Sequence, residues 1–418
     1  MPSVEILAVG TELLLGQLVD TNTAHVARAL AENGVDVYGT HAVGDNRERI
    51  AAAIAAALER ADGVVTTGGL GPTVDDLTKE AVCDALGCES ELNAQALENI
   101  EEIFRRSKRE MRENNRKQAE IPAGATVLHN DRGTAPGFIV QREDGKFVAC
   151  MPGVPDEMRP MLEHGVLPWL RENLQLSSVI HTRVLHTINI AESEIDHRID
   201  DLFRTLENPK IAVLAHSARC DVKIMAKAAS QEAARDLIAP IEFTISKRLA
   251  GHIYGVDDQS LAGAVLTMLA HTEQTIGVAE SCTGGRLAAE ITAVPGSSKS
   301  FMGGVVAYDN FVKEELLGVN KATLTRFGAV SEETAREMAQ GVRAALKTSI
   351  GIATTGVAGP GGGSEEKPVG LVWIGLADGN GVHAYKGQWR GSRVSIQTRA
   401  TTHALGLLWR ALARVEPF

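Results

Sequence analysis

Two segments of this 418-residue sequence combine reactive side chains with glycines, and each follows an apolar run typical of a buried strand. The first, TTGGLGPTVDDLT (66–78), has three glycines followed by Asp75 and Asp76. Carboxylates bind divalent cations, and the amides of glycine loops bind phosphate. This segment therefore predicts metal-assisted chemistry on a pyrophosphate, with both aspartates as metal ligands. The alternative is that either aspartate only caps the helix that follows.

The second segment, AESCTGGRLAAEIT (279–292), places Ser281 where a strand is expected to end and a helix to begin. The N–H groups of Thr283, Gly284 and Gly285 are predicted to face its hydroxyl and to form an oxyanion hole. The alternative is that Ser281 or Thr283 is only the N-cap of the helix.

A serine hydroxyl needs a base, and the next strand–helix unit, GGVVAYDNFVKEELLG (303–318), offers one. Lys313 lies in the first turn of the expected helix, where partial desolvation favours the neutral amine. Tyr308 at the strand end is predicted to relay or orient the proton. The alternatives are a packed tyrosine and a surface lysine paired with Glu314 or Glu315.

A glycine run, TTGVAGPGGGSEEKPVG (354–370), predicts a nest of amides for a phosphate, with Arg393 as its counter-ion. A flexible hairpin loop is the alternative. The residues predicted to bind substrate are Gly356, Ala358, Gly359, Gly361, Gly362 and Arg393.

Further loops are expected at the same sheet edge as the two aspartates. They are GTELLLGQLVDTNT (10–23), NNRKQA (114–119), NDRGTAPGF (130–138) and PGVPDEM (152–158). The predicted residues of this first site are Thr11, Glu12, Asn22, Gly68, Gly69, Gly71, Asp75, Asp76, Thr78, Asn115, Lys117 and Glu157.

Apolar strands alternate with helices over much of the chain, which predicts an α/β protein with doubly wound parallel sheets. We expect three domains: an α/β domain at 1–171, a small α+β module at 172–254 and a second α/β domain at 255–418. In the middle module, VIHTRVLHTINI alternates as a strand, and the segments 192–206 and 231–249 are expected to be helical.

The charge is −11 overall, and residues 1–171 hold 17 basic against 27 acidic residues. Such a chain is a poor nucleic-acid binder, because neutralising phosphates supplies most of that affinity. The five cysteines form no C-x-x-C, so we expect neither a disulfide scaffold nor a thiolate zinc site. With no apolar run long enough for a membrane and no secretory signal, a cytoplasmic protein is expected.

The segments of the first site, taken in order, resemble the competence/damage-inducible protein A (CinA) family, whose first domain is similar to molybdopterin-binding domains. The resemblance implies hydrolysis of ADP-ribose to AMP and ribose 5-phosphate, with a divalent metal ion at Asp75 and Asp76. Glu12 or Glu157 would assist. The alternative is that this domain only binds a pterin or a nucleotide.

The second half resembles the CinA C-terminal domain through AES-x-TGG, Y-x4-K and G-x-AGP-x-GG-x-x-x-KPVG, met from Ala279 to Gly370. The resemblance implies hydrolysis of nicotinamide mononucleotide (NMN) to nicotinic acid mononucleotide and ammonia, without a cofactor. Ser281 would be acylated, with Lys313 and Tyr308 as proton-transfer partners. It also implies a homodimer. A non-catalytic adaptor in competence or recombination is the alternative function.

The sequence departs from the family in two places. GSRVSIQ has Ser392 and Gln397 where the family often has an aspartate and a second arginine, which leaves Arg393 as the anion ligand. The middle module resembles a KH fold, but NIAES stands in place of G-I-G-E-S. Without the G-x-x-G loop that clamps a nucleic-acid backbone, we expect a spacer or a dimer element.

Overall fold

The computed structural model describes residues 2–174, 176 and 178–414. These residues form two compact units, of which the first runs up to Thr182 and includes Ala226–Leu237. The second comprises Arg183–Met225 and the chain from Ile238 onward. No helix in the described part of the chain has both the length and the apolar character needed to cross a lipid bilayer.

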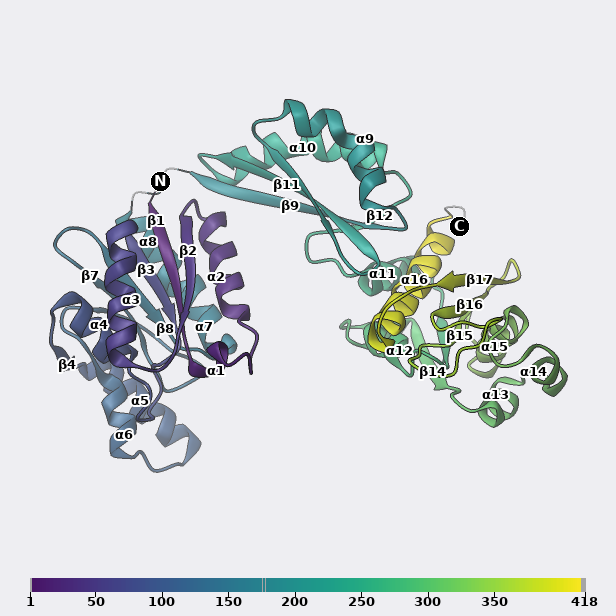
Figure 1. Cartoon of the computed structure of the whole chain (residues 1–418), viewed down its shortest axis with the longest axis horizontal. Helices are drawn as coiled ribbons and strands as arrows, with labels where there is room; N and C mark the ends of the chain where they lie inside the picture. The colour runs from purple at the N-terminus through teal and green to yellow at the C-terminus, as the bar shows by residue number, and fades with distance from the viewer. Residues whose placement is uncertain (1, 175, 177, 415–418) are drawn as a thin grey trace. The chain divides into compact units, whose positions relative to one another are not determined.

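The first unit is built on a six-stranded sheet in the order β2-β1-β3-β8-β7-β6 (Figure 1). β1, β2, β3 and β8 are parallel neighbours, whereas β7 is antiparallel to both β8 and β6. The sheet is therefore mixed rather than parallel throughout, because no helix separates β6, β7 and β8 along the chain. The strands are β1 (Ser3–Val9), β2 (Asp36–Val43), β3 (Gly63–Thr67), β6 (Thr126–Leu128), β7 (Gly137–Gln141) and β8 (Phe147–Met151).

Helices cover both faces of this sheet, which confirms the doubly wound α/β class. On one face Ile6 and Val65 pack with Val26 and Met158, and on the other Val64 packs with residues of α3 and α4. The helices of the unit are α1 (Thr11–Leu14), α2 (Thr21–Glu32), α3 (Arg47–Arg60), α4 (Thr78–Leu86), α5 (Ala94–Ser107), α6 (Glu113–Arg116), α7 (Pro155–Met161) and α8 (Leu167–Asn173). Two short strands, β4 (Ser90–Leu92) and β5 (Glu120–Pro122), pair separately.

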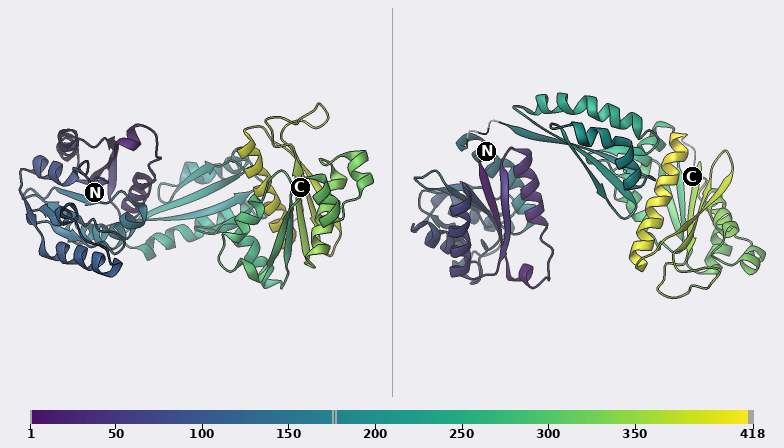
Figure 2. Two further views of the ribbon diagram at one scale, coloured as in Figure 1. Left: turned by 90° about the horizontal axis from the view of Figure 1, so that it is seen from below. Right: turned by 45° about the horizontal axis from the view of Figure 1, so that its top comes forward.

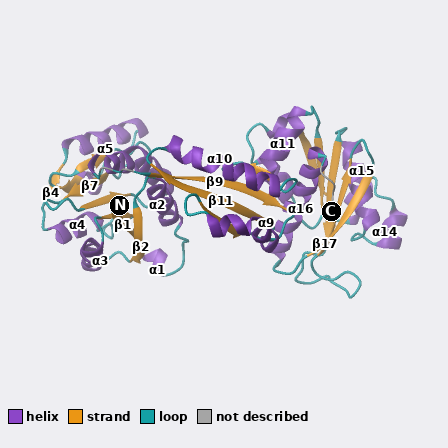
Figure 3. Ribbon diagram, turned by 90° about the horizontal axis from the view of Figure 1, so that it is seen from above, coloured by secondary structure: helices purple, strands orange, loops and turns teal. Residues whose placement is uncertain are grey.

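The middle segment forms a four-stranded sheet in the order β10-β11-β9-β12, accompanied by two helices (Figure 3). β10 and β11 are antiparallel, as are β12 and β9. The small α+β arrangement expected here is present. Its elements are β9 (Val179–Ile188), α9 (Glu192–Thr205), β10 (Lys210–Ala215), β11 (Arg219–Ala228), α10 (Gln231–Arg248) and β12 (Ile253–Val256).

The second unit also holds a five-stranded sheet in the order β14-β13-β15-β16-β17. β13 runs parallel to both neighbours, but β16 and β17 pair antiparallel, so this sheet is mixed as well. The cause is the same, since β15, β16 and β17 follow one another without an intervening helix. The strands are β13 (Ile276–Glu280), β14 (Phe301–Val306), β15 (Ile350–Gly356), β16 (Leu371–Ala377) and β17 (Val382–Gln388).

Two groups of helices enclose this sheet (Figure 2). Val265, Leu287 and Ala400 represent α11, α12 and α16 in one core, and Leu317 and Met338 represent α13 and α15 in the other. The helices are α11 (Leu261–His271), α12 (Arg286–Thr292), α13 (Asn310–Leu317), α14 (Lys321–Phe327), α15 (Glu332–Ala345) and α16 (Arg393–Ala413).

We expect Gly341→Ala to destabilise the second unit by about 2 kcal/mol, the usual cost of overpacking a tight contact. A Cβ at Gly341 in α15 would lie 1.8 Å from the carbonyl oxygen of Leu317 in α13, and backbone cannot move aside cheaply. Thermal unfolding of the variant measures the loss. Gly379→Ala is the control, because nothing lies within 4 Å of a Cβ there. Equal stability of both variants contradicts the prediction.

Candidate functional sites

The carboxyl ends of four parallel strands in the first unit open into one cavity of about 590 Å³. Gly10 follows β1, Asp45 follows β2, Gly68 follows β3 and Gly153 follows β8, and all four line the cavity. Ligands of open α/β sheets bind at this edge, where loops from neighbouring strands meet. The cavity is therefore the first candidate site.

Its most distinctive chemical feature is an excess of carboxylates. Five acidic residues line it, whereas none of the described residues that line it is a lysine or an arginine. The charged side chains that a pyrophosphate would meet here are all negative, so a bridging cation would offset the repulsion. The five residues are Glu12, Asp45, Asp75, Asp76 and Glu157.

The carboxylates do not form a complete metal cage. In residues 2–174, 176 and 178–414, no group of three His, Cys, Asp or Glu side chains is placed to hold a metal ion. Mg²⁺ usually keeps several waters and takes one or two carboxylates together with substrate phosphate oxygens. The donor set fits that mode, with Asp75 and Asp76 among the residues available as ligands.

Thr73 organises the two adjacent aspartates. Its hydroxyl lies within hydrogen-bond distance of Asp75 Oδ1 and at 2.6 Å from Asp76 Oδ2, and its N–H donates to the same Asp76 oxygen at 2.8 Å. Hydrogen bonding from Thr73 lowers the pKa of the Asp75 carboxyl. Helix α4 begins after Leu77 and has no side-chain cap, so the capping alternative for these aspartates is wrong.

The cavity brings together seven of the twelve predicted residues. Three others support its loops: Thr11 exchanges hydrogen bonds with Asp45, the Asn22 amide donates to Gly153 O, and the Thr78 hydroxyl donates to Gly68 O. The remaining two lie elsewhere, since Asn115 caps α6 and Lys117 pairs with Glu80. The seven lining residues are Glu12, Gly68, Gly69, Gly71, Asp75, Asp76 and Glu157.

Asp45 was not among the predicted residues. Asp45 follows the strand segment VDVYGTHAV and Gly44. This position, at the carboxyl end of a parallel strand, is the sequence signal by which it could have been found.

The second candidate site begins at the carboxyl end of β13. Glu280 of β13 pairs with Val306 of β14, so Ser281 and Ala307 are the next residues on two adjacent parallel strands. Ser281 is half-buried, and its N–H donates to Thr354 O of β15. This hydrogen bond to β15 fixes the backbone position from which the Ser281 hydroxyl projects.

Lys313 places its amine at this same edge. The residue is 1% exposed, and Nζ donates to the carbonyl oxygens of Ala307 at 2.7 Å and Tyr308 at 3.3 Å. Burial lowers the pKa of Lys313, and Cys282, the residue after Ser281, lies within electrostatic range of the amine. A neutral amine has two N–H donors for the two carbonyls and retains a lone pair. The surface-lysine alternative is wrong.

Tyr308 contributes its carbonyl to the amine, while its phenol is engaged elsewhere. Arg393 donates from Nη2 to Tyr308 Oη at 3.0 Å and from Nη1 to Gly359 O at 2.8 Å. The tyrosine side chain is not packed in the core, since the residue is 63% exposed. Arg393 therefore joins the strand end that carries Tyr308 to the glycine loop after β15.

The glycine loop after β15 is partly buried. Gly356 is the last residue of β15, Ala358 and Gly359 are buried, and Gly361 and Gly362 are exposed. Gly356 thus ends the strand, and the other four predicted positions lie in one loop that Arg393 contacts through Gly359.

The two residues of GSRVSIQ that depart from the family pattern have structural roles. Ser392 caps α16 by accepting from Ser395 N, and the Gln397 amide donates to Cys282 O at 2.8 Å. Gln397 therefore supports the Ser281 loop without adding a charge.

Glu280, which was not predicted, organises the loop around Ser281. Its carboxylate accepts from the N–H groups of Gly285, Leu287 and Ala288 at 3.0, 3.1 and 2.8 Å, and the residue is 1% exposed. Helix α12 begins after Gly285, so neither Ser281 nor Thr283 is its N-cap. Instead, the negative charge of the buried Glu280 carboxylate stabilises the positive N-terminal end of α12.

This arrangement changes the predicted oxyanion hole. The Gly285 N–H is bound by Glu280, and the Gly284 N–H donates to Ser281 O. The Thr283 hydroxyl shares a 2.6 Å hydrogen bond with Thr354. Since both glycine amides already have acceptors, Thr283 is the member of the predicted set best placed to serve as a backbone donor.

We expect Glu280→Gln to lower the free energy of unfolding by about 2 kcal/mol, because an amide offers one acceptor oxygen where the carboxylate serves three donors. Thermal unfolding measures this loss. Glu290→Gln on α12, the helix that Glu280 caps, is the matched control, with an expected change within about 0.5 kcal/mol. Unchanged stability of Glu280→Gln contradicts the capping role.

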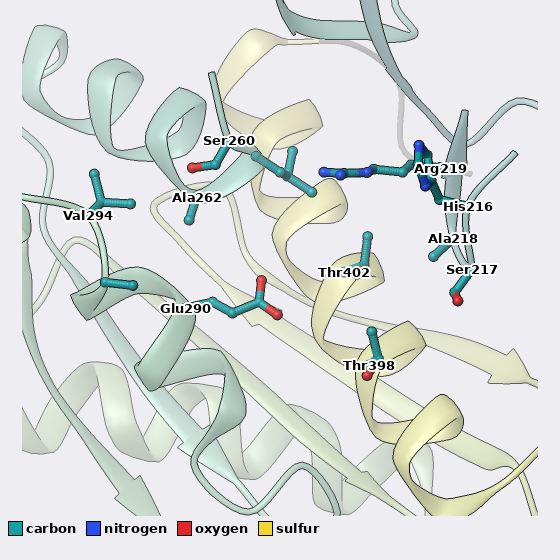
Figure 4. Close-up of a pocket in the computed structure, with 12 residues that line it drawn as sticks. His216, Ser217, Ala218, Arg219, Ser260, Ala262, Glu290, Val294, Thr398 and Thr402 are labelled. Atoms are coloured by element: carbon teal, nitrogen blue, oxygen red, sulfur yellow. The ribbon is translucent and has the colours of Figure 1, made fainter. Parts of the chain in front are cut away.

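A further cavity of about 580 Å³ lies in the second unit (Figure 4). His216 and Arg219 from the β10–β11 turn line it, together with Glu290 of α12 and Thr398 and Thr402 of α16. None of the predicted substrate or catalytic residues lines this cavity.

Three family models match successive parts of the chain. The probable molybdopterin binding domain matches residues 5–172, the KH domain of damage-inducible protein CinA matches 182–255, and the CinA C-terminal domain matches 258–412. The four-stranded middle sheet thus coincides with the KH match.

Relatives match over nearly the whole length. A putative competence-damage inducible protein of Moorella thermoacetica is 46% identical over 98% of this chain and 98% of its own. A protein with the same description from Caldicellulosiruptor bescii is 45% identical over 97% and 98%. The crystal structure of competence/damage inducible protein CihA from Agrobacterium tumefaciens is 41% identical, covering 37% of this chain and 93% of that chain, with a TM-score of 0.36. By these full-length matches, the chain belongs to the CinA family of competence/damage-inducible proteins.

Proposed function

We propose that this protein is a bifunctional hydrolase of pyridine-nucleotide salvage. The Ser281 site hydrolyses the carboxamide of NMN to nicotinic acid mononucleotide and ammonia. The acidic cavity of the first unit hydrolyses ADP-ribose to AMP and ribose 5-phosphate with the help of a divalent cation.

The observation that carries the deamidase proposal is the buried amine of Lys313 at the end of β14, the strand next to β13, which ends directly before Ser281. Burial disfavours the charged form of a lysine, so a larger fraction of the amine is neutral and available as a base than for a lysine in water. A serine paired with such a base becomes a nucleophile, as in other hydrolases with a serine and a lysine.

The proposed reaction proceeds in two stages. Ser281 Oγ attacks the carboxamide carbon and its proton passes to the neutral Lys313 amine, which then returns a proton to the leaving ammonia. Water next attacks the acyl-serine ester and gives up a proton to Lys313. Lys313 returns this proton to Ser281 Oγ as the ester bond breaks, and nicotinic acid mononucleotide departs. Arg393 and the loop around Gly359 would hold the phosphate of the substrate.

Purified protein with NMN is expected to release ammonia without added metal, and an ammonia assay tests this directly. No release from NMN contradicts the deamidase proposal and favours the adaptor alternative.

That the protein forms a homodimer remains a prediction, and light scattering measures its oligomeric state.

Removing metal is expected to abolish cleavage of ADP-ribose. The acidic cavity repels the pyrophosphate unless a cation neutralises it, and a bound divalent ion would supply charge stabilisation at that phosphate. AMP release is measured with Mg²⁺, after EDTA, and after Mg²⁺ is restored. Cleavage that persists in EDTA contradicts the proposal, and binding without cleavage favours the pterin- or nucleotide-binding alternative.

A further inference from the structure

Two exposed aliphatic side chains line the cavity of the first unit together with its five carboxylates. Leu18 is 59% exposed and Val154 is 53% exposed, and both belong to the cavity wall. Solvent-exposed apolar surface inside a cavity is a feature of ligand-binding clefts. Part of the ligand should therefore be apolar.

A backbone hydrogen bond links each aliphatic residue to one of the acidic residues of the cavity. The carbonyl of Glu12 accepts from Gln17 N at 2.9 Å and from Leu18 N at 3.4 Å. The carbonyl of Val154 accepts from Glu157 N at 3.0 Å in the first turn of α7. On both sides of the site, an apolar side chain and a carboxylate are thus parts of one local structure.

The loops that carry these residues are also held from outside the cavity. Asn22 at the start of α2 donates to Gly153 O at 2.7 Å, directly before Val154. Asp20, two residues after Leu18, caps α2 by accepting from Thr23 N at 2.9 Å. Both aliphatic residues therefore lie next to an anchored backbone, as a preorganised binding wall requires.

We infer that Leu18 and Val154 bind the nucleobase of the substrate, while the carboxylates hold the cation on its diphosphate. This inference rests on the proposed pyrophosphatase function and adds the element of substrate recognition. The ligand class is a nucleoside diphosphate derivative, in which a flat, weakly polar ring is joined to a metal-binding phosphate chain. A diphosphate without a base uses the carboxylates alone.

The test compares ADP with inorganic pyrophosphate, both with Mg²⁺, by isothermal titration calorimetry on the full-length protein. Leu18→Ala and Val154→Ala are each expected to weaken ADP binding about tenfold, since each removes two or three carbons of apolar contact. Pyrophosphate binding should stay unchanged. Leu14→Ala is the matched control, because Leu14 is 54% exposed in the same segment but does not line the cavity.

The outcomes separate this inference from the pyrophosphatase proposal. An equal loss for pyrophosphate, no loss for ADP, an equal loss in Leu14→Ala or a wild-type protein that does not bind ADP each overturns the inference. Failure to cleave ADP-ribose, with ADP binding and its dependence on Leu18 intact, overturns only the catalytic proposal for this cavity.

Discussion

Replacing Ser281 with alanine is expected to reduce ammonia release from NMN at least about a thousandfold, because the proposed reaction passes through an ester on this hydroxyl. The loss should appear in kcat, while the affinity for NMN stays close to that of the wild type. Since the Ser281 N–H, which donates to Thr354 O, is unchanged, the loop should keep its backbone position.

The matched control is Ser298→Ala, an exposed serine in the same unit, which should retain full activity. A second readout is mass spectrometry of the quenched wild-type reaction, where the acylated serine should be detected. Activity retained by Ser281→Ala contradicts the nucleophile assignment.

Replacing Lys313 with methionine is expected to reduce ammonia release to a similar extent, because a base and acid of this kind contributes about 10²–10⁴-fold. Wild-type kcat/KM should rise with pH as the amine loses its proton. Burial lowers the pKa of Lys313 below its ordinary value, so the midpoint of this rise should lie below the pH at which a lysine in water titrates. Lys321→Met, at an exposed lysine, is the control.

Lys313→Met is expected to reduce activity but to increase the stability of the fold. A lysine whose folded pKa lies below its unfolded value opposes folding at low pH, and the opposition fades as the pH rises from the folded to the unfolded pKa. Lys313→Met should therefore gain stability relative to the wild type at neutral pH, with a gain that shrinks towards pH 10.5. A variant that loses activity but unfolds less readily separates catalysis from folding. Retained activity contradicts the base assignment.

The α/β class was predictable because strand and helix periodicities are local properties of the sequence. The strand arrangement was less so. The strands β7 and β16 run antiparallel to their neighbours, and the expected fully parallel sheets are therefore wrong. The absence of a helix between consecutive strands was the available signal, since a parallel connection needs a crossover.

The candidate sites were predictable at the level of loops. Asp76 and Glu157 are 81 residues apart in sequence, yet the carboxyl ends of β3 and β8 bring both to one cavity. Asn115 and Lys117 were placed with them because NNRKQA was expected to be a further loop of this site, but neither residue lines the cavity. The ends of the parallel strands predicted correctly which loops lie together. The positions of Asn115 and Lys117, in the helix-rich connection between β4 and β5, were not predicted correctly.

By itself, the sequence determined the class of fold, the family and the chemical groups available: a serine, a lysine, paired aspartates and glycine loops. Tertiary structure decided the state of those groups. Burial lowers the pKa of Lys313, and Glu280 accepts hydrogen bonds from amides that a strand–helix turn otherwise leaves open. Five carboxylates share a cavity whose described lining has no basic side chain. The physical reason is that desolvation and hydrogen-bond partners come from residues distant in sequence, and only folding brings them together.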